Sequence, residues 1–170
     1  MMKPKLKEYL NMLNKDELQE QIIELATIFP QVNDYYILKI NGELEENLLE
    51  LYKKKINNEI FPESKEQRVK YSVISEAIIE FQQISNVPEN TVILMFYYID
   101  QALSFIEVCK NVDEKFFISI EGVFDKALNL IFKHELEEKF QEKIKYILDK
   151  SKKEIFEFRN NMLNIYSCYY

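Results

Sequence analysis

Apolar residues recur at every third or fourth position along the chain, the spacing that places them on one face of an α-helix. The cleanest example lies in the second half, where Phe116, Ile120, Phe124 and Ile131 follow one another at this spacing. Apolar runs such as Tyr35 to Leu38 fit a helical stripe at least as well as a strand. The pattern therefore predicts an all-α protein.

Start and stop signals divide this pattern into about seven or eight helices. Asn14 and Glu17 have the spacing of a capping box, in which each side chain satisfies the backbone N–H of the other residue. Pro30 ends one apolar stripe and can begin the next helix, and Pro88 opens another. The expected helices cover roughly residues 6–13, 15–29, 30–38, 44–60, 69–84, 89–108, 113–131 and 135–166.

The last of these segments has two interpretations. Its apolar positions from Leu136 to Ile165 would share one side of a single long helix. However, Ser151 and Glu154 have capping-box spacing, which favours a break near Lys150. Two lysines in that first turn would oppose the helix dipole. We favour two helices by a narrow margin.

The segment 89–108 is expected to be the central helix. It is apolar on nearly every side, and such a helix belongs inside a bundle with neighbours on several faces.

Short connections predict that successive helices pack as antiparallel neighbours. We therefore expect one all-helical domain over 1–170, with N-terminal helices in 1–62 and a bundle core in 63–170. Two αα repeat-like units near 68–108 and 113–166 are possible. Gly122, inside a helical pattern, suggests a close approach of two helices, and the alternative interpretation is a ligand that approaches the backbone.

Composition narrows the function classes. The 170 residues include only two glycines, so a glycine-rich phosphate loop and a dinucleotide-binding fingerprint are excluded. The net charge of −7 argues against general nucleic-acid binding, because an acidic protein repels a polyanion. The lysine runs Lys53 to Lys55 and Lys150 to Lys153 leave anion or nucleic-acid binding as a minor alternative.

Residues with catalytic potential are sparse. His134 is the single histidine, and Cys109 and Cys168 stand apart from each other and from it. We therefore predict no catalytic residues, no metal site and no cofactor.

Isolated cysteines are typical of a protein in a reducing compartment. The N-terminus lacks an apolar signal core, and the longest apolar run, Val92 to Ile99, is far shorter than a membrane span. We expect a cytoplasmic protein without membrane contact.

Asp100 is the one acidic residue that looks out of place, because it interrupts the most apolar helix. If buried, it needs a partner such as a tyrosine hydroxyl, a lysine or Arg68. Its neighbours Tyr97 and Tyr98 could line a pocket with it. Tyr35 and Tyr36 form a second adjacent pair, and one tyrosine of each pair is expected to reach a groove or surface.

Several short motifs occur along the chain: Asn14 to Leu18, Phe29 to Val32 with Tyr35-Tyr36, Phe61-Pro62, Glu76 to Ile78, Leu94-Met95 with Tyr97 to Ile99, and Val112 to Glu114. Together they resemble an uncharacterised bacterial domain-of-unknown-function family of small all-helical proteins. They span nearly the whole chain. The resemblance implies an all-helical fold and brings no known activity.

Three functions remain open at this point. The first is a non-enzymatic helical module that binds a protein or peptide, or associates with copies of itself. The second is a small-ligand binder or enzyme with a pocket near Asp100, Tyr97 and Arg68. The third is an anion or nucleic-acid binder that uses the lysine runs. Because the chain lacks a recognisable catalytic set, we favour the first.

Overall fold

The computed structural model describes residues 2–41, 44–62, 69–85, 87–109, 112–151 and 156–170, and these form nine helices and no strand. The all-α prediction is therefore confirmed. The chain divides into two compact units, Met1–Leu44 and Glu45–Tyr170. Each unit is described by itself.

The first unit contains α1 (Met2–Met12), α2 (Lys15–Ile28) and α3 (Pro30–Asn41). The predicted capping box starts α2: the Asn14 side chain accepts from the Glu17 backbone N–H at 2.9 Å, and Glu17 accepts from the Asn14 N–H at 2.8 Å. Gln21 donates to the Tyr9 hydroxyl at 2.6 Å and so ties α2 to α1. α2 also packs on α3.

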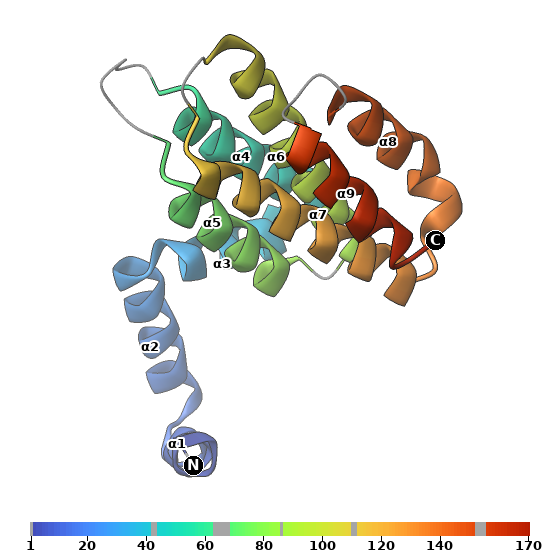
Figure 1. Ribbon diagram of the computed structural model, residues 1–170. Helices are drawn as coiled ribbons and strands as arrows, with labels where there is room; N and C mark the ends of the chain where they lie inside the picture. The colour runs from blue at the N-terminus through green and yellow to red at the C-terminus, as the bar shows by residue number, and fades with distance from the viewer. Residues whose placement is uncertain (1, 42–43, 63–68, 86, 110–111, 152–155) are drawn as a thin grey trace. The chain divides into compact units, whose positions relative to one another are not determined.

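The helices of the second unit pack around one core (Figure 1). These helices are α4 (Leu44–Ile60), α5 (Tyr71–Ile84), α6 (Pro88–Val108), α7 (Glu114–Lys133), α8 (Glu137–Lys150) and α9 (Phe156–Ser167). α6 packs against α5, α7 and α8, and α7 packs in turn against α8 and α9. The expected central helix is therefore confirmed, because α6 contributes nine buried residues.

α4 joins this core through aromatic side chains. Tyr52 is fully buried, and its ring meets the edge of Phe81 on α5 at 5.4 Å between centroids. Just after α4, Phe61 meets Phe105 on α6 at 5.8 Å. The division between the two units places nearly all of α4 in the second one.

Asp113 caps the start of α7, where its side chain accepts a hydrogen bond from the Lys115 N–H at 3.1 Å.

The turn between α7 and α8 is short and hydrogen bonded. Glu135 in this turn has a φ of 55°, a left-handed conformation that lets the Leu136 N–H reach the Ile131 carbonyl at 3.0 Å. The exposed His134 occupies this turn as the C-terminal cap.

The C-terminal segment forms two helices, as we favoured. α8 ends at Lys150, and α9 begins at Phe156. Ser151 is buried, and its hydroxyl donates to the Leu148 carbonyl at 2.8 Å. The other members of the proposed capping box lie outside the described residues.

Among the helices that the structure describes, α6 is long and apolar enough to cross a membrane by length and composition. More than half of its most apolar stretch is buried inside the protein. The core helix of a water-soluble bundle has these same properties.

Our interpretation of Gly122 was wrong. Gly122 is exposed on α7, and a Cβ atom placed there would meet no other atom within 4 Å. None of the described helices approaches closely at this position, so the missing side chain creates no packing contact with them. The glycine therefore only increases the backbone entropy lost on folding.

We predict that Gly122→Ala raises the free energy of unfolding by about 1 kcal/mol, because alanine is the better helix former and fits without a clash. For a chain of this size the melting temperature should rise by about 2–4 °C. Urea unfolding followed by circular dichroism measures the change. A loss of stability would show that the backbone at Gly122 departs from an ordinary helix.

Candidate functional site

Asp100 on α6 is held by three side chains of α8. Its carboxylate accepts hydrogen bonds from the Lys150 ammonium at 2.6 Å and from the Tyr146 hydroxyl at 3.0 Å. Lys143 places its ammonium 3.5 Å from the second carboxylate oxygen. Asp100 is half-buried, so these donors replace the water that the helix face excludes. The expected tyrosine and lysine partners are confirmed.

Lys150 closes the network. Besides the carboxylate, it donates to the Asp100 backbone carbonyl at 3.0 Å and to the Ser104 hydroxyl at 2.7 Å. Lys143 also lies over the Tyr146 ring, with its nitrogen 4.5 Å from the centroid. We call Asp100, Ser104, Lys143, Tyr146 and Lys150 the α6–α8 polar cluster. Its oxygen and nitrogen atoms are engaged with one another, which is typical of a structural tie between helices.

The charges of the cluster stabilise each other. Partial burial by itself raises the Asp100 pKa. The Lys150 hydrogen bond and the charges of Lys143 and Lys150 lower this pKa by more than burial raises it, so the Asp100 pKa lies below its ordinary value. Burial alone lowers the Lys150 pKa, and the hydrogen bond and charge of Asp100 more than reverse this effect. Both residues are therefore charged at neutral pH.

The two tyrosines next to Asp100 do not face one pocket together. Tyr98 is fully buried, and its hydroxyl lies 3.0 Å from the Ser119 hydroxyl on α7. Burial raises the Tyr98 pKa to about 12, partly offset by that hydrogen bond. Tyr97 is half-buried, with the Lys53 ammonium 5.7 Å from its ring centroid. Arg68, the third expected member of this pocket, lies outside the described residues.

Tyr35 and Tyr36 contact each other within the first unit. Their rings meet edge to face at 5.2 Å between centroids, and both side chains are half-buried. The Lys39 ammonium lies 4.6 Å from the Tyr35 ring centroid. A hydrogen bond and the charge of Tyr35 raise the Lys39 pKa.

The lysine runs do not form an open basic surface in the described residues. Lys53 pairs with Glu50 at 2.7 Å, and Lys55 lies over the Tyr52 ring at 4.3 Å. Lys150 belongs to the α6–α8 polar cluster. Lys152 and Lys153 lie outside the described residues.

Described residues of the second unit line two hollows that lie away from Asp100, Tyr97 and Tyr98. The first, between α4 and α5, has a volume of about 260 Å³ and is lined in part by Glu59, Glu76 and Glu80. The second, between α8 and α9, has a volume of about 350 Å³. We call this second hollow the α8–α9 groove. Its lining residues are Gln141, Ile144, Lys145, Leu148, Asp149, Arg159, Leu163, Tyr166 and Tyr170.

The first unit leaves its apolar side chains uncovered. No residue of α2 is buried. Among the residues that the structure describes, ten of the twenty exposed large apolar side chains lie before residue 42. They are Leu6, Tyr9, Met12, Ile22, Ile23, Leu25, Ile28, Phe29, Ile37 and Ile40. A unit of this size buries too little apolar area to form a core of its own.

The remaining chemically reactive residues do not gather. His134 is exposed, Cys168 is exposed, and both cysteines carry free thiols. In the described ranges no group of three or more His, Cys, Asp or Glu side chains is placed to hold a metal ion.

Comparison with known families gives one result. Residues 1–169 match DUF6155, a family of unknown function. The chain belongs to this family. The expected resemblance to an uncharacterised family is confirmed over nearly the whole length. No curated protein and no solved structure matches this DUF6155 chain.

Sequence reasoning found Asp100 in this DUF6155 chain but missed the residues of α8 that hold it. A signal for them was present, because Lys143, Tyr146 and Lys150 are spaced i, i+3, i+7 and so share one helix face. The α8–α9 groove gave no comparable signal. It depends on how two helices pack, and single-helix periodicity does not contain that information.

We predict that Asp100→Asn and Lys150→Met each lower the free energy of unfolding by about 1–2 kcal/mol at pH 7. Each substitution leaves the remaining half-buried polar groups with poorer hydrogen-bond partners. Solvent screens part of the resulting loss of electrostatic stabilisation, which keeps the effect small. The double variant should lose less than the sum of the two changes. Urea unfolding measures all four proteins, with the exposed Lys126→Met as a control that should change little.

The same comparison has an expected pH dependence. Because the Asp100 pKa is lower in the folded state than in the unfolded state, its contribution is complete above the unfolded pKa and is lost as the pH falls through the folded value. The difference between the natural protein and Asp100→Asn should therefore shrink from about pH 5 towards pH 3. A difference that stays constant over this range would contradict the ion pairing.

Proposed function

We propose that the protein is a non-enzymatic helical interaction module whose first unit supplies the binding surface. The uncovered apolar side chains of α1 to α3 carry this proposal. Exposed apolar residues in this density mark association surfaces, because leaving them in water costs free energy that a partner surface would recover.

α2 has the pattern of a helix that binds through one face. Ile22, Leu25 and Phe29 are exposed at the spacing i, i+3, i+7, which places them in one stripe. Glu20 and Glu24 are also exposed and lie one turn apart on another side of the helix. A helix of this kind lays its apolar stripe into a groove and leaves its acidic side outside the apolar contact.

The alternative of a ligand pocket around Asp100 has less support. The donors of α8 satisfy the carboxylate, and Tyr98 is buried against Ser119. Nucleic-acid binding has less support as well, because the net charge is −7 and the described lysines of both runs, apart from the exposed Lys54, contact acids or aromatic rings.

The expected setting is the cytoplasm of a bacterium, with no membrane contact and with a protein or peptide as the partner. The bacterial assignment rests on the resemblance of the sequence motifs. The free thiols, one of them exposed, are compatible with a reducing compartment.

We predict that Leu25→Glu weakens association of the protein with its partner by about 10- to 100-fold, because it removes a leucine from the contact and puts a charge there. Affinity isolation from the source cytoplasm with quantitative mass spectrometry, together with sedimentation of the purified chain, would measure the loss. Thr27→Glu is the matched control, since it adds the same charge in the neighbouring turn on the acidic side of α2.

Urea unfolding must accompany these measurements. If Leu25→Glu leaves association unchanged and lowers the stability of the whole chain, the stripe is covered by the protein itself. That result would overturn the proposed function.

A further inference from the structure

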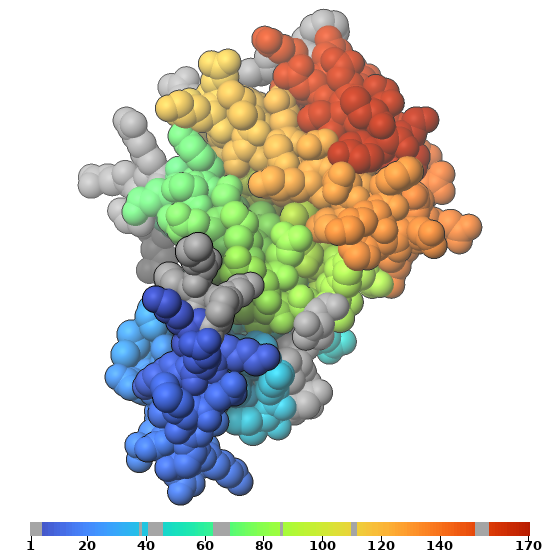
Figure 2. All heavy atoms as spheres, turned by 90° about the horizontal axis from the view of Figure 1, so that it is seen from below, coloured from blue at the N-terminus to red at the C-terminus, as the bar shows by residue number. Residues whose placement is uncertain are grey.

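The α8–α9 groove combines an apolar floor with an aromatic wall. Ile144 is buried beneath it, and Leu148 and Leu163 line its sides. Tyr166 and Tyr170 stack at one end, with ring centroids 4.8 Å apart and planes 17° from parallel. The segments that form this part of the surface, coloured orange and red, adjoin on the face shown in Figure 2. Such a surface suits the apolar side chains of a docked helix.

The groove lining also carries two cationic side chains and one acidic side chain. Lys145 and Arg159 both line it, and within the described ranges neither forms an ion pair or a hydrogen bond. Arg159 is half-buried, and an arginine in that position gains strongly from a carboxylate partner. Asp149 is the one acidic residue of the lining. The groove therefore favours an apolar occupant with acidic side chains.

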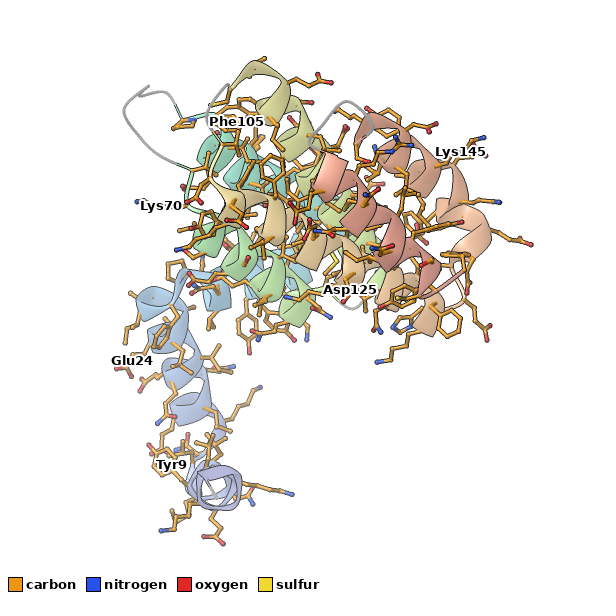
Figure 3. The ribbon with its side chains drawn as sticks, viewed as in Figure 1. Tyr9, Glu24, Lys70, Phe105, Asp125 and Lys145 are labelled. Atoms are coloured by element: carbon orange, nitrogen blue, oxygen red, sulfur yellow. The ribbon has the colours of Figure 1, made fainter. Side chains whose placement is uncertain are left out.

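The chain itself contains a helix of this chemistry. α2 has four acidic residues and one lysine, an uncovered apolar stripe and no buried residue. Glu24 and Lys145 both point away from their own helices (Figure 3). α1 does not fit, because three of its four charged residues are lysines and the groove would repel them.

We propose that α2 of one copy of the protein docks in the α8–α9 groove of a second copy. Ile22, Leu25 and Phe29 would lie on the apolar floor, and Glu24 would lie near the cationic rim of Lys145 and Arg159. Each chain carries both the helix and the groove, so two copies can make the contact twice, once in each direction. This inference rests on the proposed function, since it names the partner of the same helix face.

The test uses two full-length variants that are each defective in one half of the contact. Leu25→Glu disables the helix and keeps the groove. Lys145→Glu with Arg159→Glu disables the groove and keeps the helix. Each variant alone should associate at least tenfold more weakly than the natural protein. An equimolar mixture should form a 1:1 complex through the one intact helix and the one intact groove. Sedimentation velocity measures all of these species.

Two controls separate loss of the contact from a general charge effect and from misfolding. Lys126→Glu reverses an exposed lysine on α7 outside the groove and should leave association unchanged. If the charge-reversed groove variant fails to fold by circular dichroism, Lys145→Glu with Tyr170→Ser replaces it, since both of these side chains are exposed.

Each outcome decides the inference. A 1:1 complex in the mixture supports it. A natural protein that stays monomeric at about 100 μM overturns it, because a specific dimer contact would be populated at that concentration. Association that Leu25→Glu abolishes but the mixture does not restore also overturns it, and the proposed function then stands with α2 bound to another surface. Association that Leu25→Glu leaves unchanged overturns both.

Discussion

The folded state of the second unit depends on the burial of α6. This helix is apolar on nearly all sides, so it can leave water completely only if other helices cover it all round. α5, α7 and α8 supply this cover, and α9 packs behind α7. A bundle with a central rod follows from that single requirement, and short connections between the helices are enough to complete it.

Asp100 is the exception on α6, and it determines how α8 docks. A carboxylate on a half-buried helix face must have hydrogen-bond donors, because a buried charge without partners costs several times the free energy of an ordinary contact. α8 provides Lys150, Tyr146 and Lys143 from one face. The apolar core holds the helices together, and the polar cluster fixes the register of α8 on α6.

The first unit presents the opposite situation. Its helices have the same kind of apolar stripe, but three short helices do not enclose enough volume to bury it. The acidic α2 and the cationic α8–α9 groove are complementary features of one sequence. Unburied apolar surface is unfavourable in water, and the association that we propose would cover it.

The sequence by itself determined the helices, the central place of α6, the capping of α2 and the need of Asp100 for a lysine or tyrosine, because each depends on residues a few positions apart. The role of Gly122, the exposure of the stripe on α2 and the groove beside Arg159 were decided by tertiary structure. They depend on which helix faces meet, and those faces belong to residues far apart in the chain. Local spacing shows that a helix has an apolar face; packing alone shows whether another helix covers it.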